Sequence, residues 1–235
     1  MYFPWLGMFE QIKISDVFVY YDDVQMPLGR SFMSRVQIKG AQGVRWLTVP
    51  IRRQAGQLIN EVEIDETKPW RREHLGLIND AFRDARFKAD AVRIVEDVFD
   101  AGDRQLSRLT IRSMQAVCAY LGLERPVVIA SELAAQGHGT ERLTDVLLKT
   151  GATRYVTGHG AANYLDHPKM EAMGIEVAYM DYAKLPYAQS HGPFTPYVTA
   201  LDAIAHLGKS AREQLVSRST PWREFMASRD PGAAC

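Results

Sequence analysis

Hydrophobic residues recur along the chain with different periods, and each period predicts a different kind of element. Apolar positions at helical spacing over residues 6–14 predict a short helix, and the apolar run at 17–21 predicts a buried strand. Short connections after this strand favour antiparallel pairing, so we expect a β-rich N-terminal third. Its further extended segments are predicted at residues 36–38, 45–51 and 58–64, with a turn at 40–43.

The central segment has helical spacing from Trp70 to about Leu121, where apolar residues return every three or four positions. A stretch of this length fits two or three helices. Gly122 follows directly and supplies a C-terminal stop, because glycine readily adopts the left-handed conformation that ends many helices.

The second half of the chain alternates between strands and helices. Because helical crossovers connect parallel strands, we expect an α/β fold with a layered, mostly parallel sheet flanked by helices. The elements that give this expectation are an apolar run at 127–130, a helix at 140–149 closed by Gly151, and strands at 154–157 and 175–181. A Pro-punctuated loop at 185–196, a helix at 197–207 and a tail at 227–235, expected to be disordered, complete the chain.

Composition favours one globular domain over residues 1–226. The 235 residues are 46% hydrophobic and 24% charged, which is enough to bury a full core. Two small domains remain an alternative, because single cores begin to split near this length. Lys plus Arg (28) equals Asp plus Glu (28), so no overall field draws the chain to nucleic acid or to an anionic membrane.

Cysteine usage and the absence of long apolar stretches indicate the compartment. The two cysteines, Cys118 and Cys235, argue against a disulfide framework and against a cysteine-built zinc site, and Cys118 is predicted to be a core residue. No stretch approaches the roughly 18 to 20 apolar residues that span a bilayer, and the N-terminus has no basic region followed by an apolar core. We therefore expect a soluble protein of the reducing cytoplasm.

Polar and glycine-rich loops follow several predicted strands. In open α/β sheets ligands bind beyond the carboxyl ends of the strands, so the loops at 22–25, 131–140 and 157–160 are expected to share one crevice. The loop at 131–140 ends in Gly137-His138-Gly139-Thr140, where Thr140 would cap a helix whose first amides could hold a phosphate or carboxylate. A simple capped helix start is the alternative.

Two histidines are candidates for acid–base chemistry. His159 stands between Gly158 and Gly160, which suits close approach to a ligand or proton transfer near neutral pH, although a tight turn would use the same glycines. His191 lies in a loop with Tyr187 and Gln189, and loops dense in such groups often bind ligands.

We expect His159 and His191 to lie in one crevice with Asp22 or Asp23 on its wall, and at least one histidine to transfer a proton. Asp22 and Asp23 are adjacent at a strand end and point to opposite faces, so at most one faces the crevice, and a turn-capping role is the alternative. His74, His167 and His206 are predicted to be structural, and no spacing resembles a zinc site. The expected substrate contacts are Gln25, Arg30, Ser131, Gly137, Gly139, Thr140, Glu141, Arg142, Gly158, Gly160, Tyr164, Tyr187 and Gln189.

Aromatic residues gather at Tyr2-Phe3-Pro4-Trp5 and recur at Trp46 and Trp70. A place in the core is the ordinary reading for such residues. A platform on which a sugar ring stacks is the alternative.

A set of ordered segments along residues 2–207 carries a family resemblance. The segments are Tyr2-Phe3-Pro4-Trp5-Leu6-Gly7, Phe18 to Gln25, Trp46 to Pro50, Ile59-Asn60-Glu61, Trp70 to His74, Thr140 to Leu143, Gly158 to Leu165, and Tyr187 to Gly192 with Phe194 and Pro196-Tyr197. Together they resemble the WbqC-like family. This resemblance implies a protein of O-antigen or related surface-polysaccharide biosynthesis that acts on a nucleotide-linked or lipid-linked sugar.

From this setting we expect a transferase that moves an acyl or aminoacyl group to an amino sugar, with a phosphate-bearing sugar or acyl donor as small-molecule partner. A non-catalytic sugar- or nucleotide-binding component of a biosynthetic complex is the alternative. The chain departs from the family at its start, since members usually open with an apolar strand ending in Gln-Pro, whereas Met1 here directly precedes Tyr2. We expect the natural protein to begin upstream with that strand.

Overall fold

A computed structural model describes residues 1–29 and 31–229 of the chain. They form two compact units, each assembled from three segments. The first unit comprises Met1–Phe9, Asp22–Glu124 and Lys184–Leu215, and the second comprises Glu10–Tyr21, Arg125–Ala183 and the segment from Val216 onward. Helix α1 (Leu6–Ile14) begins in the first unit and ends in the second.

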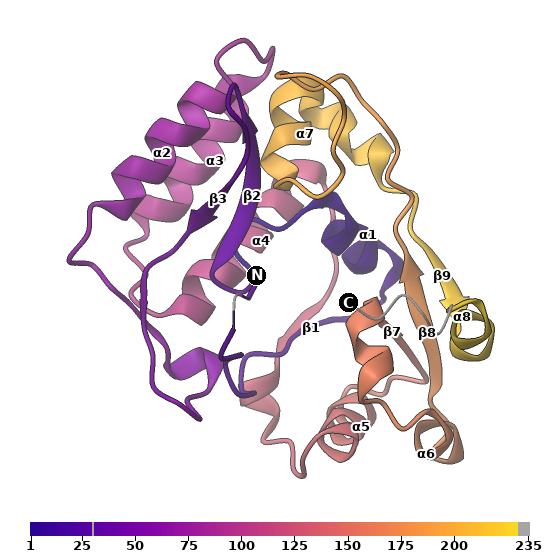
Figure 1. Cartoon of the computed structure of the whole chain (residues 1–235). Helices are drawn as coiled ribbons and strands as arrows, with labels where there is room; N and C mark the ends of the chain where they lie inside the picture. Colours follow the sequence, from indigo (N-terminus) through magenta and orange to yellow (C-terminus); the bar gives the residue numbers. More distant parts are fainter. Residues whose placement is uncertain (30, 230–235) are drawn as a thin grey trace. The chain divides into compact units, whose positions relative to one another are not determined.

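The first unit combines a β-hairpin with helices (Figure 1). Strands β2 (Arg35–Gly40) and β3 (Gly43–Thr48) pair antiparallel around a tight turn. The turn needs Gly43, whose φ of 93° is a conformation that only glycine adopts without strain. The helices of this unit are α2 (Trp70–Ala81), α3 (Lys88–Asp100), α4 (Leu106–Leu121) and α7 (Ala200–Leu207), with 3-10 turns at Ile59–Glu61 and Gly208–Gln214.

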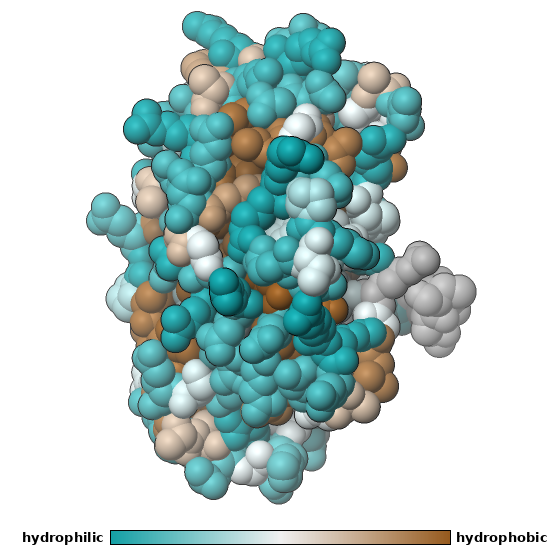
Figure 2. All heavy atoms as spheres, turned by 90° about the vertical axis from the view of Figure 1, so that its left-hand side faces the viewer, coloured by the Kyte–Doolittle hydropathy of each residue, from teal (hydrophilic) through white to brown (hydrophobic). Residues whose placement is uncertain are grey.

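Helix α2 shows why these segments fold as helices against a core. Its buried residues Trp70, His74, Ile78 and Ala81 recur every three or four positions and make one apolar face. The opposite face is polar, and Figure 2, which looks onto the side carrying α2, shows mainly hydrophilic side chains with smaller hydrophobic areas between them.

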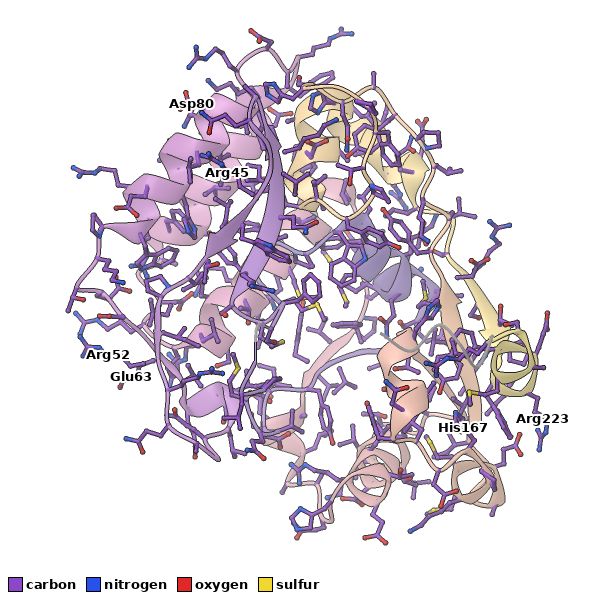
Figure 3. The ribbon with its side chains drawn as sticks, in the orientation of Figure 1. Arg45, Arg52, Glu63, Asp80, His167 and Arg223 are labelled. Atoms are coloured by element: carbon purple, nitrogen blue, oxygen red, sulfur yellow. The ribbon has the colours of Figure 1, made fainter. Side chains whose placement is uncertain are left out.

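A second antiparallel pair in the first unit joins β4 (Ile51–Arg52) to β5 (Glu63–Ile64). Arg52 lies opposite Glu63 in this register, and Figure 3 shows the two labelled side chains next to each other. Arg52 also donates to Asp65 at 3.1 Å, an exposed ion pair of small energetic weight.

The second unit contains the parallel strands. Strand β1 (Phe18–Tyr20) pairs parallel with β6 (Val127–Ile129), and β7 (Arg154–Thr157) pairs parallel with β8 (Glu176–Asp181). Strand β9 (Arg218–Pro221) adds an antiparallel edge to β8. The helices of this unit are α5 (Thr140–Lys149), α6 (His167–Ala172) and α8 (Trp222–Ser228), with 3-10 turns at Ala130–Leu133 and His159–Asn163.

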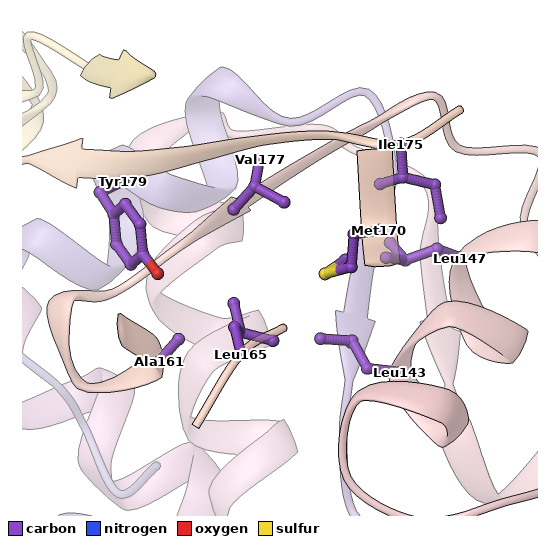
Figure 4. Packing of buried hydrophobic residues seen from close by; sticks show 8 residues of the cluster. All are labelled: Leu143, Leu147, Ala161, Leu165, Met170, Ile175, Val177 and Tyr179. Atoms are coloured by element: carbon purple, nitrogen blue, oxygen red, sulfur yellow. The ribbon is translucent and has the colours of Figure 1, made fainter. Parts of the chain in front are cut away.

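Figure 4 shows the apolar cluster at the centre of the second unit. Met170, Val177 and Tyr179 are fully buried, and Leu143 and Leu147 reach them from one face of α5. Trp222 and Phe225 of α8 pack against the same cluster while half-buried, so the C-terminal helix covers this core with aromatic rings.

Several predicted elements are confirmed. The helix at 6–14, the helix at 140–149 and the strand at 154–157 have the predicted bounds, and Gly122 ends α4 with a φ of 64°. Three helices fill the central segment as predicted. The fold is mixed α/β, as expected.

Other expectations need correction. The segment 58–64 is a 3-10 turn followed by β5, since Glu61 accepts the Leu58 backbone N–H and curls the chain. Helix α7 begins at Ala200 because the Thr199 hydroxyl accepts the Leu201 N–H and caps it. Ala227 and Ser228 belong to α8, so the predicted disordered tail starts too early, and residues 230–235 lie outside the described ones.

The sheet also differs from the layered arrangement that was expected. The described strands form four small sheets, of which the largest has three strands. The partners β1 and β6 are more than a hundred residues apart, a pairing that local pattern does not encode. The single domain over 1–226 stays a prediction. Within the described ranges, none of the helices combines the length and apolar character needed to cross a bilayer.

Candidate active site

A buried lysine fixes the loop at 187–195 of the first unit. Lys39 of β2 is 5% exposed, and its ammonium donates to the carbonyl oxygens of Gly192 at 2.7 Å and Pro193 at 2.6 Å. It also donates to Gln189 Oε1 at 3.3 Å. A buried ammonium needs several acceptors to offset its desolvation, and the loop provides them.

The Gln189 side chain is the second anchor of this loop. Its Nε2 donates to the Thr195 carbonyl at 3.1 Å and to the Tyr187 hydroxyl at 3.0 Å, and its Oε1 accepts the Thr195 backbone N–H at 2.9 Å. Donors and acceptors at both ends of the amide define its orientation. The loop between Tyr187 and Thr195 is therefore held in one conformation.

Tyr187 carries this network to a buried carboxylate on α7. Its hydroxyl donates to Asp202 Oδ1 at 2.8 Å, and Asp202 is 1% exposed. One helical turn further along, His206 Nδ1 donates to the Asp202 backbone carbonyl at 2.8 Å and lies 3.4 Å from Oδ1. Residues four apart share one face of a helix, so Asp202 stands directly behind the imidazole.

Ser190 meets the other side of this imidazole. Its Oγ lies 2.9 Å from His206 Nε2, and its backbone N–H donates to the same nitrogen at 2.9 Å. Because the backbone amide can only donate, Nε2 is an acceptor and the ring proton of the neutral imidazole is on Nδ1, facing Asp202. The lone pair of Nε2 is thus aimed at Ser190.

Asp202 makes His206 a stronger base than a free imidazole. Burial lowers the pKa of His206, but the hydrogen bonds to Asp202 and the charge of that carboxylate outweigh it, and the net pKa is raised. The charge of Lys39 opposes this to a smaller extent. The order of hydroxyl, imidazole and carboxylate is the one that activates serine nucleophiles in unrelated enzymes.

His191, which the sequence predicted as catalytic, follows Ser190 and is exposed. Its Nε2 donates to the Ala81 carbonyl at 2.9 Å, and its φ of 65° is unusual for a residue with a side chain. The histidine therefore ties the loop to the end of α2. Its predicted role in proton transfer is not tested by this contact.

The segment that follows β1 contains three more predicted residues, Asp22, Asp23 and Gln25. The Asp22 carbonyl accepts the Asn60 N–H at 2.9 Å, and Gln25 pairs with Leu58 through the backbone. Asp22 is buried and Asp23 is half-buried. Arg30 lies outside the described residues.

His159 lies in the second unit. Its Nε2 donates to the Met180 carbonyl at 2.7 Å, and its ring is 4.7 Å from that of Phe225. Gly158 precedes the 3-10 turn that contains His159 and Gly160, as the tight-turn reading expects. His159 and His191 belong to different units, and their shared crevice stays a prediction.

The start of α5 differs in detail from the prediction. Gly139, with a φ of 54°, is the N-cap, and Thr140 is the first helical residue. Because Thr140 already stands inside the helix, its hydroxyl does not cap α5 and instead accepts the Asp166 N–H at 3.2 Å. Glu141 forms an exposed ion pair with Lys169 at 2.8 Å. Anion binding at this turn stays a prediction.

The remaining candidates of the second unit have separate positions. Ser131 lies in the 3-10 turn after β6, and Arg142 donates through Nη1 to the Ala135 carbonyl. Tyr164 follows the turn at His159–Asn163 and is 63% exposed. Gly137 has a φ of 87°, and a Cβ there would come within 3.1 Å of Glu141.

The aromatic residues divide between core and surface. Tyr2, Phe3 and Trp70 are almost fully buried, as the core reading predicted. A second group, here called the aromatic row, consists of Trp5, Phe32 and Trp46, with ring centroids 5.2 and 5.6 Å apart in succession. Phe32 and Trp46 of this row are 43% and 36% exposed, and the Arg35 guanidinium lies 3.9 Å from the Trp46 ring centroid.

No group of three or more His, Cys, Asp or Glu side chains that could hold a metal occurs among the described residues. Cys118 is half-buried, and burial raises the pKa of its thiol to about 12. A thiol with that pKa is almost wholly protonated near neutral pH and is a poor nucleophile.

Sequence reasoning did not select Ser190, Lys39 or Asp202, and it assigned His206 a structural role. One available signal was the spacing of Asp202 and His206, which places them on one face of a predicted helix. No local signal shows that Ser190 folds back onto that face, because Lys39 positions the loop from a strand about 150 residues earlier.

The described units define a mixed α/β protein with a hydroxyl–imidazole–carboxylate cluster in its first unit. The chain belongs to the WbqC-like protein family, whose model matches residues 1–214. It is 31% identical over 218 residues to a protein of Mycobacterium tuberculosis (strain ATCC 25618 / H37Rv) named "Uncharacterized protein Rv1507c", covering 91% of this chain and 94% of that protein. No solved structure matches the chain significantly.

Proposed function

We propose that the protein is a cytoplasmic transferase that moves an acyl or aminoacyl group to the amine of a nucleotide-linked or lipid-linked amino sugar, in O-antigen or related surface-polysaccharide biosynthesis. The observation that carries the proposal is the position of His206 between the Ser190 hydroxyl, at 2.9 Å, and the buried Asp202 carboxylate, at 3.4 Å. Family membership supports the setting.

His206 is the base in this proposal. An attacking amine must lose a proton as it becomes an amide, and an imidazole held with Nε2 unprotonated can accept that proton. Asp202 stabilises the imidazolium that forms. This assigns to His206 the role that the sequence suggested for His159 or His191. A carboxylate stands behind the His206 ring, whereas Nε2 of His159 and of His191 is hydrogen-bonded to a backbone carbonyl.

The test is a direct assay of amide formation. The whole chain is incubated with a panel of nucleotide-linked amino sugars and acyl thioesters or aminoacyl donors, and the products are examined by mass spectrometry. We expect one sugar to gain the mass of the acyl group. The proposal fails if the folded protein consumes no amino sugar with any donor class.

His206→Gln is the informative variant in this assay. A glutamine amide oxygen can still accept the Ser190 N–H and hold the loop, but it is not a base. General-base catalysis contributes roughly 10²- to 10⁴-fold, so amide formation is expected to fall by that factor while sugar binding persists.

The aromatic row favours a second candidate function, that of a non-catalytic sugar-binding component. Partly exposed rings such as Trp46 and Phe32 can stack on the apolar face of a sugar, and Arg35 beside them suits a phosphate. Binding of a nucleotide sugar that is lost in Trp46→Ala and unchanged in His206→Gln, with no amide formed by the wild type, would favour this function.

A further inference from the structure

We infer that Ser190 is a covalent nucleophile that carries the acyl group between donor and acceptor. The identity of the acceptor rests on the proposed function, whereas the reactivity of the Ser190 hydroxyl does not. The geometry that carries the inference is the 2.9 Å separation of Ser190 Oγ from His206 Nε2.

The alternative role for Ser190 is purely structural, in which its bond to His206 only holds the loop in place. The hydrogen bonds of the cluster argue against this as the whole explanation. Holding the loop requires an acceptor for the Ser190 N–H, which His206 provides without any hydroxyl. The buried Asp202 carboxylate already accepts a hydrogen bond from the Tyr187 hydroxyl, so a purely structural role for Asp202 does not require His206 one helical turn away. A purely structural role does not explain why the hydroxyl is also placed at Nε2.

The backbone after Ser190 forms a sharp turn. His191 and Gly192 both have positive φ, of 65° and 94°. For His191 this conformation is strained, and its bond to the Ala81 carbonyl helps to hold it. Strained turns present nucleophilic serines in hydrolases of other folds, where they expose the hydroxyl and exclude other loop conformations.

Ser190 is half-buried and its neighbour His191 is exposed, so this part of the loop reaches the surface. Lys39 and Gln189 hold the chain on either side of it. A substrate can therefore approach a serine whose surroundings are already ordered, which lowers the entropic cost of reaction.

The proposed covalent cycle has two steps. Ser190 Oγ attacks the carbonyl carbon of an acyl thioester, the Oγ–C bond forms, and the hydroxyl proton moves to His206 Nε2. The C–S bond breaks, and the thiolate takes the proton and leaves as a thiol. The amine then attacks the acyl-serine, the N–C bond forms, the C–Oγ bond breaks, and His206 returns the proton of the amine to Oγ.

The test uses an alkyl phosphonofluoridate, which reacts with activated serines by forming an Oγ–P bond and releasing fluoride. Trypsin cleaves after Lys184 and Lys209, and the resulting peptide, residues 185–209, contains Ser190 as its single serine. We expect this peptide to gain the mass of the phosphonyl group. Ser190→Ala is expected to remove the adduct. Ser228→Ala, an exposed serine of the second unit, is the matched control and should leave it unchanged.

His206→Gln should slow labelling roughly 10²- to 10⁴-fold in a protein with an unchanged circular dichroism spectrum. Ser190→Cys gives a second readout, because a thiol facing the same imidazole should react with iodoacetamide faster than Cys118 does. No adduct on the 185–209 peptide of the folded protein, or equal labelling rates in wild type and His206→Gln, would overturn the inference.

The outcomes separate this inference from the proposed function. Labelling of Ser190 without any amide product would retain the nucleophile and remove the amino-sugar acceptor. Undiminished amide formation by Ser190→Ala would retain the transferase and overturn the covalent step.

Discussion

Two histidines of the molecule, His206 in the first unit and His167 in the second, each hold a hydroxyl group at Nε2. His206 Nε2 is 2.9 Å from the Ser190 hydroxyl, and His167 Nε2 is 2.7 Å from the Tyr179 hydroxyl. The His167 ring also stacks on Trp222, with centroids 4.6 Å apart and an interplanar angle of 17°. The same pair of groups is thus placed in two different environments.

The environments act on the two pKa values in opposite directions. Burial lowers the pKa of His167, and the charges of Asp166 and Glu171 oppose this only in part. The pKa of His206 is also lowered by burial, but Asp202 more than restores it. Tyr179 is fully buried, whereas Ser190 is half-buried. A histidine–hydroxyl bond therefore indicates a base only where a carboxylate stands behind the ring and the hydroxyl can be reached.

Replacing each of the two histidines should change the labelling rate of Ser190 very differently. His206→Gln should lower the rate of Ser190 labelling roughly 10²- to 10⁴-fold, because it removes the base that faces the hydroxyl. His167→Gln should leave that rate nearly unchanged, since Ser190, His206 and Asp202 all belong to the first unit and His167 to the second. Equal losses in the two variants would show that His206 is not the base that activates Ser190.

A third histidine, His74, is also bonded to a hydroxyl group but has no carboxylate partner among its hydrogen bonds to the described residues. His74 accepts from the Tyr2 hydroxyl at 2.9 Å, and burial lowers its pKa to about 4, opposed by a hydrogen bond to the Thr48 backbone. The unfolded chain binds this proton near pH 6.5 and the folded chain only near pH 4, so stability is full above pH 6.5 and falls as the pH drops through this window.

The expected loss from this group is about 3 kcal/mol between pH 6.5 and pH 4, from the difference of the two pKa values. Urea unfolding at a series of pH values measures it, and His74→Gln supplies the reference curve. If the difference between the two curves did not change across this range, His74 would not be held neutral by the fold.

The smallest effect concerns stability in the second unit. His167→Phe keeps the stack on Trp222 and removes the partner of the buried Tyr179 hydroxyl, which should cost about 1–3 kcal/mol. Urea unfolding measures the loss, and Tyr179→Phe in the same background should recover part of it. A variant as stable as the wild type would mean that this hydroxyl does not need His167.

The sequence predicts those elements whose signals are local. The helix at 140–149 and the helix end at Gly122 could be predicted, because apolar periodicity and the helix-ending preference of glycine are properties of a few neighbouring residues. The sheet arrangement could not be predicted in this way, since β1 pairs with β6 from a distant part of the chain and the described strands form several small sheets.

The candidate site divides in the same way. Asp202 and His206 stand four residues apart on a predicted helix, so the sequence allows their contact to be predicted, although Asp202 was not among the predicted site residues. The contact of Ser190 with His206 could not be predicted, because it depends on a loop that Lys39 and Gln189 hold through hydrogen bonds between distant parts of the chain. Tertiary contacts of this kind leave no periodic signal.

The pH profile of Ser190 labelling shows whether Ser190, His206 and Asp202 act together. A base must be unprotonated to act, so the labelling rate of the wild type should rise with pH, with its midpoint at a pKa above the ordinary 6.5. In Asp202→Asn the carboxylate charge is gone, and the midpoint should move to lower pH together with a lower plateau rate. Identical midpoints in the two proteins, or a rate that does not depend on His206, would contradict the assignment of Ser190, His206 and Asp202 as one catalytic unit.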